Sequence, residues 1–301
     1  MPAMEAEQEQ HEPPQREEEE EEEAVNRLLQ NINIQEKEQS GSTPPDLVEV
    51  EKILGYRFKN KRLLEEAFTH ASFSGDGASY ERLEYVGDAV LTLLFTKEHY
   101  FLYPDLPPGP LTQLRAANVD SEKLARAAVK HGLHSFLRHK KPFLEEKIQR
   151  FTQGISEYPL HSNGLVHVPK ALADIVESCI GAVFIDSDSS MDIVWTVVKT
   201  LLEPIITPAT IGTHPVTRLY QFCQKRNLAV KFVDLWKECT AFDVLIDGQH
   251  VGRGVCGLKK EIACNRAAKN AMDNIDRIFR DKDLFQDHEC VNDNNVELSE
   301  E

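Results

Sequence analysis

The segment Ser79–Leu94, SYERLEYVGDAVLTLL, most constrains how this chain can fold. Its apolar residues recur at helical spacing, which predicts an amphipathic and largely buried helix. Glu81, Glu84 and Asp88 stand at i, i+3 and i+7, so three carboxylates lie along one stripe of that helix. Neighbouring carboxylates on a packed helix repel one another and lose hydration, so they require compensating positive charge.

A solvated acidic face is the alternative explanation for these acids. It fits poorly, because Leu83, Val86 and Gly87 crowd the same short segment. Glycine inside a helix costs about 1 kcal/mol relative to alanine. Gly87 therefore indicates that another part of the backbone approaches the helix closely.

A second predicted helix, Lys170–Phe184 (KALADIVESCIGAVF), carries Asp174 and Glu177 three residues apart. Two apolar helices that each bear spaced carboxylates can face one another around hard divalent cations. Ligation by oxygen alone favours Mg²⁺ or Mn²⁺ over Zn²⁺. A di-iron carboxylate bundle requires Glu-x-x-His, and neither helix supplies that histidine. The residues therefore predict a metal site suited to phosphate chemistry.

These segments resemble a known family. ERLEYVGDAVL is similar to the signature of the ribonuclease III family, and ADIVESCIGAVF is similar to the second acidic helix of that family. The resemblance extends from Val48 to about Asp186 and includes Val48–Phe73 and Pro108–Ala128. It resumes near Pro215 as a double-stranded-RNA-binding domain. Tyr80 and the motif PGPLTQLR make the chain resemble eukaryotic members of the family, above all the plant ribonuclease-three-like proteins.

The resemblance implies an endoribonuclease that cleaves double-stranded RNA by metal-assisted hydrolysis, as a homodimer whose two sites cut opposite strands. It implies Mg²⁺, with Mn²⁺ able to substitute, held by four residues: Glu84, Asp88, Asp174 and Glu177. Glu81, Asp88, Glu177 and Lys170 are then the candidate catalytic residues. Lys170 matches a lysine of Dicer-type members, although a surface lysine at a helix start is an equally good interpretation. Pro108 departs from bacterial members, which have an acidic residue there.

The charge distribution separates the predicted domains from two acidic tails. The formal net charge is −16, of which residues 1–44 carry −10 and residues 281–301 carry −7, so the chain between them is near neutral. Segments so acidic bury too little apolar surface to fold by themselves, and both are predicted to be disordered tails. We predict a nuclease domain over 45–203, a linker over 204–214 and an RNA-binding domain over 215–280.

Targeting signals give little information. The chain starts without an apolar signal segment and has no run of eighteen apolar residues, so neither secretion nor a membrane span is expected. Its six cysteines form no C-x-x-C pair and are expected to be reduced thiols. Location in the nucleus, the cytoplasm or both is the expectation.

The C-terminal domain is predicted to have the order α-β-β-β-α. Pro215–Asn227 is a predicted helix. Three strands, Ala229–Trp236, Ala241–Ile246 and Gln249–Val255, follow, with a tight turn at Asp247-Gly248, before a closing helix Leu258–Phe279. This order resembles a double-stranded-RNA-binding domain, which reads the shape of A-form RNA through phosphates and 2′-hydroxyls. Residues 216–280 carry a net charge of +5.

The candidate RNA contacts are Arg115, Asn118, Lys259, Lys260 and Arg266. The RNA-binding domain departs from its family at two places. Glu261 and Cys264 stand where lysines usually hold phosphates, and the loop Lys237–Thr240 is too short for the usual minor-groove contact, so modest RNA affinity is expected. Cys264 beside Lys260 is expected to have a lowered thiol pKa, which would permit redox control, while simple helix packing is the favoured interpretation.

Two functions compete on this fold. An active endoribonuclease is favoured because every expected carboxylate is present. A catalytically weak or inactive RNA-binding scaffold is the alternative, since such proteins normally lose carboxylates. The natural RNA stays open between ribosomal precursors, small-RNA precursors and structured messages.

Overall fold

The structure is a computed structural model, and it describes residues 47–74 and 77–289. The predictions for the tail 1–44 and for residues 290–301 lie outside the described residues. Residues 281–289, which the charge pattern assigns to the C-terminal tail, belong to the last helix. Among the described residues, no helix combines the length and the apolar character needed to cross a membrane.

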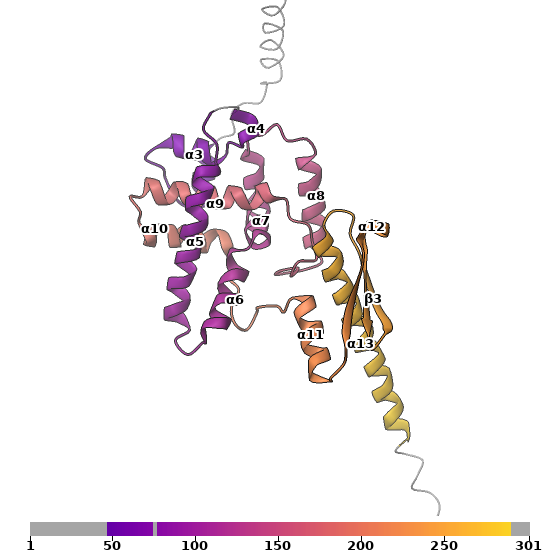
Figure 1. Ribbon diagram of the computed structural model, residues 1–301. Coiled ribbons are helices and arrows are strands. Elements are labelled where there is room, and N and C mark those ends of the chain that lie inside the picture. Colours follow the sequence, from indigo (N-terminus) through magenta and orange to yellow (C-terminus); the bar gives the residue numbers. More distant parts are fainter. Residues whose placement is uncertain (1–46, 75–76, 290–301) are drawn as a thin grey trace, which may run out of the picture. The chain divides into compact units, whose positions relative to one another are not determined.

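The first domain is helical, as predicted (Figure 1). Its elements follow one another along the chain as α2 (Leu47–Leu54), α3 (Lys61–Ala67), α4 (Ala71–Ser74), α5 (Glu81–Leu102), α6 (Pro108–Val119), α7 (Ser121–Lys130), the 3₁₀ helix η1 (Leu133–Phe136), α8 (Leu144–Ile155), α9 (Lys170–Asp186) and α10 (Met191–Leu202). Proline at the first position of α6 fits a helix start, because that position needs no backbone N–H donor.

Helix α9 is the centre of this domain because it is apolar on nearly all sides. Thirteen of its seventeen residues are buried, and α5 crosses it (Figure 1). A β-carbon added at Gly87 of α5 would lie 1.8 Å from the carbonyl oxygen of Glu177. A β-carbon at Gly181 of α9 would lie 2.1 Å from the carbonyl oxygen of Leu83. The close backbone approach predicted from Gly87 is confirmed.

The second domain has its own core and the predicted order α-β-β-β-α. It consists of α11 (Pro215–Lys225), β1 (Val230–Leu235), α12 (Trp236–Cys239), β2 (Ala241–Ile246), β3 (Gln249–Val255) and α13 (Lys260–Glu289). The antiparallel sheet has the order β1-β2-β3. Asp247 and Gly248 have φ angles of 49° and 78°, which is typical of the tight hairpin turn expected there.

The sheet packs closely on α13. A β-carbon added at Gly254 of β3 would lie 2.2 Å from the carbonyl oxygen of Ala263, so glycine is needed for strand and helix to touch. The short segment predicted as the loop Lys237–Thr240 is mostly the single-turn helix α12. It ends at Thr240, whose φ of 53° turns the chain into β2.

Candidate active site

The acidic residues of two helices meet where α5 crosses α9. Glu84 of α5 and Asp174 and Glu177 of α9 each offer a carboxylate oxygen within 4.8 Å of the others. Glu81 and Asp88 line the same hollow. Residues almost a hundred positions apart in the chain are thus brought together by the glycine contact between the helices.

Lys170, at the start of α9, neutralises part of this cluster. Its ammonium nitrogen lies 2.6 Å from Oε1 of Glu84 and 2.7 Å from Oδ1 of Asp174. Although burial opposes it, the hydrogen bonds to these two carboxylates raise the pKa of Lys170, so the side chain stays charged. The structure therefore places Lys170 against two of the candidate metal ligands.

Burial and like charge act together on Glu177. Burial is the largest cause, and together with the nearby charges of Asp88, Asp174 and Glu84 it raises the pKa of the carboxyl group to about 7. A carboxylate that is poorly solvated and repelled by three others gains most from a bound cation. Lys170 only partly offsets these effects.

Tyr80 binds one member of the acidic cluster, Asp174. Its hydroxyl group donates a hydrogen bond of 2.9 Å to Oδ2 of Asp174, whose side chain is 5% exposed. Burial and the charge of Asp174 raise the pKa of Tyr80, so it remains a donor. Sequence reasoning treated Tyr80 only as a family marker, because periodicity gives no sign of a partner on another helix.

The donor set fits a hard divalent cation. All candidate ligands are carboxylates, and no histidine or cysteine belongs to the group of described residues that could hold a metal. Oxygen ligands of this kind suit Mg²⁺ and Mn²⁺. Burial and neighbouring carboxylates disfavour the charged form of Glu177, so a bound cation would relieve this unfavourable energy.

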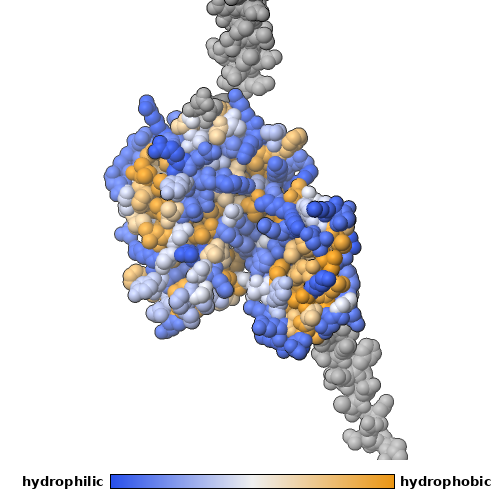
Figure 2. All heavy atoms as spheres, in the orientation of Figure 1, coloured by the Kyte–Doolittle hydropathy of each residue, from blue (hydrophilic) through white to orange (hydrophobic). Residues whose placement is uncertain are grey.

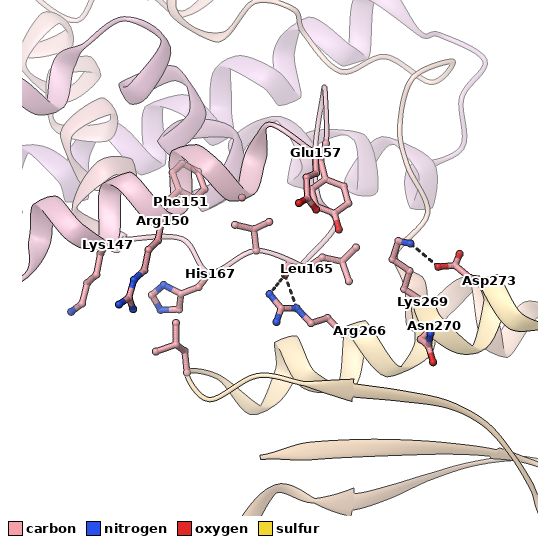
Figure 3. Close-up of a pocket in the computed structure, with 14 residues that line it drawn as sticks. Lys147, Arg150, Phe151, Glu157, Leu165, His167, Arg266, Lys269, Asn270 and Asp273 are labelled. Carbon is pink, nitrogen blue, oxygen red and sulfur yellow. Dashed lines mark hydrogen bonds and ion pairs between the residues drawn. The ribbon is translucent and has the colours of Figure 1, made fainter. Parts of the chain in front are cut away.

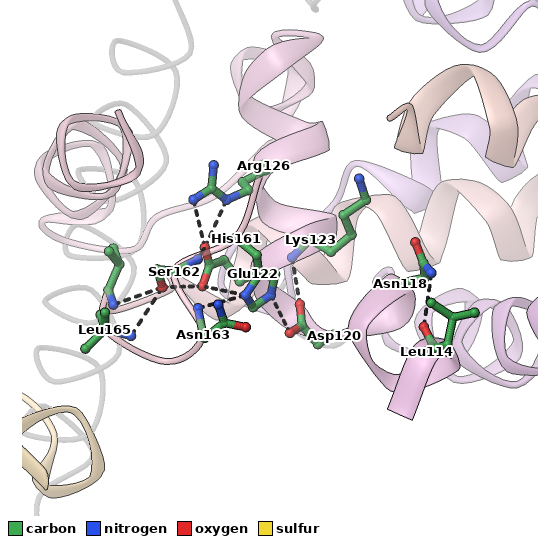
Figure 4. Close-up of polar contacts among 11 residues, drawn as sticks. Leu114, Asn118, Asp120, Glu122, Lys123, Arg126, His161, Ser162, Asn163 and Leu165 are labelled. Carbon is green, nitrogen blue, oxygen red and sulfur yellow. Dashed lines mark hydrogen bonds and ion pairs between the residues drawn. The ribbon is translucent and has the colours of Figure 1, made fainter. Parts of the chain in front are cut away.

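A second polar network borders the same hollow (Figure 4). Asp120, which lines the hollow, caps α7 by accepting a hydrogen bond from the backbone N–H of Lys123. Its other carboxylate oxygen lies 2.6 Å from Nε2 of His161, and Nδ1 of His161 lies 3.7 Å from Glu122. Glu122 accepts a hydrogen bond from the backbone N–H of Ser162. The network fastens the segment before α9 to α7, and it was not found from the sequence.

One predicted RNA contact is wrong. The side chain of Asn118 is fully buried, and its Nδ2 donates hydrogen bonds to the carbonyl oxygens of Leu114 and Ile206. Its Oδ1 accepts a hydrogen bond from the backbone N–H of Ile206. Asn118 therefore holds the segment after α10 against α6 and is not available to RNA. Arg115 is partly exposed and donates a hydrogen bond to Thr96.

The basic residues at the start of α13 have different surroundings. Lys259 is exposed, whereas Lys260 forms an ion pair of 2.5 Å with Asp234. The guanidinium group of Arg266 donates hydrogen bonds to the carbonyl oxygens of Val255 and Leu165 (Figure 3). Only Lys259 of these three has its charge free of such contacts in the described part of the chain.

The lowered thiol pKa expected for Cys264 is not found. Burial raises the pKa of its thiol, the charge of Asp234 raises it further, and Lys260 opposes them only weakly. Lys260 cannot activate the thiol because its charge is already paired with Asp234. Cys264 packs against the core of the second domain, which favours the structural interpretation over redox control.

A helical domain with crossed acidic helices, followed by an α-β-β-β-α domain, defines a nuclease that carries its own RNA-binding module. The model of the Ribonuclease III domain matches residues 81–188. Ribonuclease 3-like protein 3 from rice is 53% identical, and the match covers 77% of this chain and 79% of that protein. The chain therefore belongs to the ribonuclease III family, whose members are endoribonucleases that act on double-stranded RNA.

Two other relatives extend the comparison. Ribonuclease 3-like protein 2 from Arabidopsis thaliana is 39% identical, and the match covers 76% of this chain and 60% of that protein. Endoribonuclease Dicer homolog 1 from the same plant is 43% identical over 82% of this chain but only 13% of its own length. The similarity to Dicer thus concerns a small part of a much longer protein.

Proposed function

We propose that this chain hydrolyses the phosphodiester bonds of double-stranded RNA with Mg²⁺, and that Mn²⁺ can substitute. The observation that carries the proposal is the convergence of Glu84, Asp174 and Glu177 within 4.8 Å, with Lys170 bound to two of them. An inactive scaffold on the same fold would not need to keep four mutually repelling carboxylates. Such repulsion has a stability cost, which Lys170 offsets in part and a bound cation would offset further.

Each side chain has a defined task in this proposal. Glu84, Asp88, Asp174 and Glu177 would hold the metal, which when bound activates a water molecule and stabilises the leaving 3′ oxygen. Lys170 orients Glu84 and Asp174 and can attract a phosphate group of the substrate, since its side chain is 72% exposed. Glu81 lies at the rim of the hollow. The products would carry 5′-phosphates and short 3′ overhangs.

The proposed enzyme is a homodimer that associates through α5. Tyr85 is 81% exposed, which is unusual for an aromatic residue beside a packed core. It lines a hollow with Leu63, Val86 and Ile185. Figure 2 shows apolar patches on the surface of the helical domain, between hydrophilic residues. A second copy covering this face would place two sites on opposite strands of the RNA.

The second domain is proposed to add modest affinity for the RNA duplex. Lys259 is available, whereas Lys260 and Arg266 would first have to leave their present partners. Because each side chain would exchange one hydrogen-bond partner for another, its net contribution to the free energy of RNA binding is small. Precursors of ribosomal RNA and of small RNAs are both suitable substrates, in the nucleus or the cytoplasm.

The test is cleavage of a long, perfectly paired RNA duplex by the purified full chain. We expect cutting of the duplex in Mg²⁺ and in Mn²⁺, little cutting of the single strand, and none in a chelator. End analysis should find 5′-phosphates. Binding of the duplex without cutting in either metal would contradict the proposal and favour the scaffold.

A further inference from the structure

A second hollow in the helical domain lies away from the acidic cluster. Its volume is about 210 Å³, and its walls come from one side of α7 and from the ends of α8 and α10 with the segments that follow them. Ile155, Leu160 and Leu202 make it apolar, while three side chains of α7 bring positive charge to it: Lys123, Arg126 and Lys130. These three stand at i, i+3 and i+7, so they share one face of the helix.

Neither lysine is neutralised by an ion pair. The side chain of Lys123 is 5% exposed, and its ammonium nitrogen lies 2.5 Å from the carbonyl oxygen of Pro204. The ammonium group of Lys130 lies 2.8 Å from the carbonyl oxygen of Glu203. Carbonyl oxygens accept hydrogen bonds but bring no full negative charge. Among the described residues no carboxylate lies within ion-pair distance of either ammonium group.

Arg126 adds a third donor that is incompletely used. Its Nε donates a hydrogen bond to Oε1 of Glu122, and its Nη2 lies 2.9 Å from the same oxygen. That Nη2 atom is buried and makes no hydrogen bond of good geometry. Glu122 also lies near Nδ1 of His161 and accepts a hydrogen bond from the backbone N–H of Ser162. Its single negative charge is therefore shared among several donors. The carboxylate of Glu203 is exposed at the rim.

The pKa of Lys123 reflects its burial and the positive charges around it. Burial is the largest cause, and together with the charges of Lys130 and Arg126 it lowers the pKa of the ammonium group to about 8, with only Asp120 opposing them. A buried ammonium without a counter-ion normally costs several kcal/mol, so it is kept only where something offsets that cost. An anion in the hollow would do so.

We propose that this hollow binds a phosphate group through Lys123, Arg126 and Lys130. A tetrahedral anion with several acceptor oxygens suits three donors that line one hollow from one face of a helix. The volume is below the roughly 300–1,000 Å³ of sites for larger ligands, so it suits a single phosphate group and not a whole nucleotide. The apolar walls limit water and strengthen the attraction. This site is separate from the proposed metal ligands and does not depend on the proposed function.

The test is thermal unfolding of the full chain at pH 7 in sodium phosphate, compared with sodium chloride at equal ionic strength. A ligand that binds only the folded state stabilises it in proportion to the logarithm of its concentration above Kd. We expect phosphate to raise the Tm of the wild type in this saturable way. Lys130→Gln should weaken the response about tenfold in phosphate concentration, because one of three charged donors is lost. Lys130 is exposed, so this variant keeps its fold.

Two controls define the outcomes. Lys52→Gln removes the same charge from α2, which does not line the hollow, and should respond like the wild type. Lys123→Met keeps a long buried side chain and should lose the response. A response that is equal in the wild type and in Lys130→Gln would overturn the proposal, as would no response beyond that to chloride.

A second arm distinguishes the source of the phosphate group. A 5′-phosphorylated dinucleotide and its 5′-hydroxyl form are added in place of free phosphate. Stabilisation by the phosphorylated form alone, absent in Lys130→Gln, assigns the hollow to the end of an RNA strand. Stabilisation by free phosphate but by neither dinucleotide assigns it to the free ion.

Discussion

Gly87 of α5 and Gly181 of α9 face one another where the two helices cross. A β-carbon on Gly87 would lie 3.0 Å from the backbone nitrogen of Gly181, and one on Gly181 would lie 3.1 Å from that of Gly87. Each glycine is close-packed against the backbone of the opposite helix. The contact sets the distance at which the acidic residues of α5 and α9 can share a cation.

Gly87→Ala should therefore damage both the fold and the site. The added β-carbon would lie 1.8 Å from the carbonyl oxygen of Glu177, so the helices must separate. We expect a loss of at least about 3 kcal/mol in the free energy of unfolding, at the upper end of overpacking effects. Urea denaturation followed by circular dichroism measures it.

Gly109→Ala is the control, since no atom lies within 4 Å of a β-carbon there. It should not destabilise the protein, and because alanine is favoured over glycine in a helix it should raise the free energy of unfolding by up to about 1 kcal/mol. Equal effects of the two substitutions would contradict the importance of the crossing.

Tyr80→Phe should weaken metal binding without unfolding the protein. The ring stays in the core, but Asp174 loses the donor that orients its carboxylate. Partners of metal ligands typically contribute 10- to 100-fold to affinity, so we expect the Mg²⁺ concentration for half-maximal cleavage to rise by about tenfold. The Tm measured in a chelator should stay near that of the wild type, which separates a positioning role from a structural one.

Tyr56→Phe makes the same chemical change elsewhere. The hydroxyl group of Tyr56 donates to Asp186, at the far end of α9 from Asp174. Its Mg²⁺ requirement should match that of the wild type. A similar shift in both variants would mean that Tyr80 acts only on stability.

His161 should make the stability of the first domain depend on pH. Burial lowers the pKa of His161, but the hydrogen bond and charge of Asp120, aided by Glu122, more than compensate and raise it above 6.5. A raised histidine pKa gives stability that is complete below pH 6.5 and is lost as pH rises through the folded value. His161→Gln should therefore cost more free energy of unfolding at pH 5.5 than at pH 9.

His131→Gln is the control, because the pH dependence of its effect on the free energy of unfolding should be opposite to that of His161→Gln. Burial lowers the pKa of His131, so the wild type loses stability from this residue as pH falls. This substitution should cost less at pH 5.5 than at pH 9. If His161→Gln costs the same at both pH values, its contact with Asp120 does not involve a charged histidine.

Tyr85→Asp should convert the proposed dimer to a monomer. Burying a new carboxylate in an apolar interface costs several kcal/mol, enough to prevent association. Sedimentation velocity should show half the mass of the wild type. Tyr220→Asp, at another exposed tyrosine in the second domain, should leave the mass unchanged. A wild type that is monomeric at micromolar concentration would contradict the proposed dimer.

Periodicity and spacing predicted much of the secondary structure, because both depend on residues close together in the chain. The helical stripe of Glu81, Glu84 and Asp88 and the turn at Asp247-Gly248 follow from residues a few positions apart. The three strands begin and end within one residue of the predicted limits. Gly87 could be recognised because glycine is costly in a helix.

Contacts between distant segments could not be predicted in the same way. Asn118 hydrogen-bonds Ile206, 88 positions along the chain, so the resemblance that placed it toward RNA could not show that it is buried. Tyr80 reaches Asp174 across 94 positions. The pKa of Cys264 depends on how deeply α13 packs and on the ion pair that occupies Lys260. In each case the deciding partner is set by tertiary packing.

Cleavage of a long RNA duplex in Mg²⁺ by the wild type and by Glu177→Gln tests the central claim most directly. The substitution keeps the shape of the side chain but removes the charge that a metal requires. We predict at least about a 100-fold loss of cleavage rate with duplex binding unchanged, while Glu238→Gln in α12 cleaves normally. Cleavage by Glu177→Gln at the rate of the wild type would contradict the assignment of the active site to the crossing of α5 and α9.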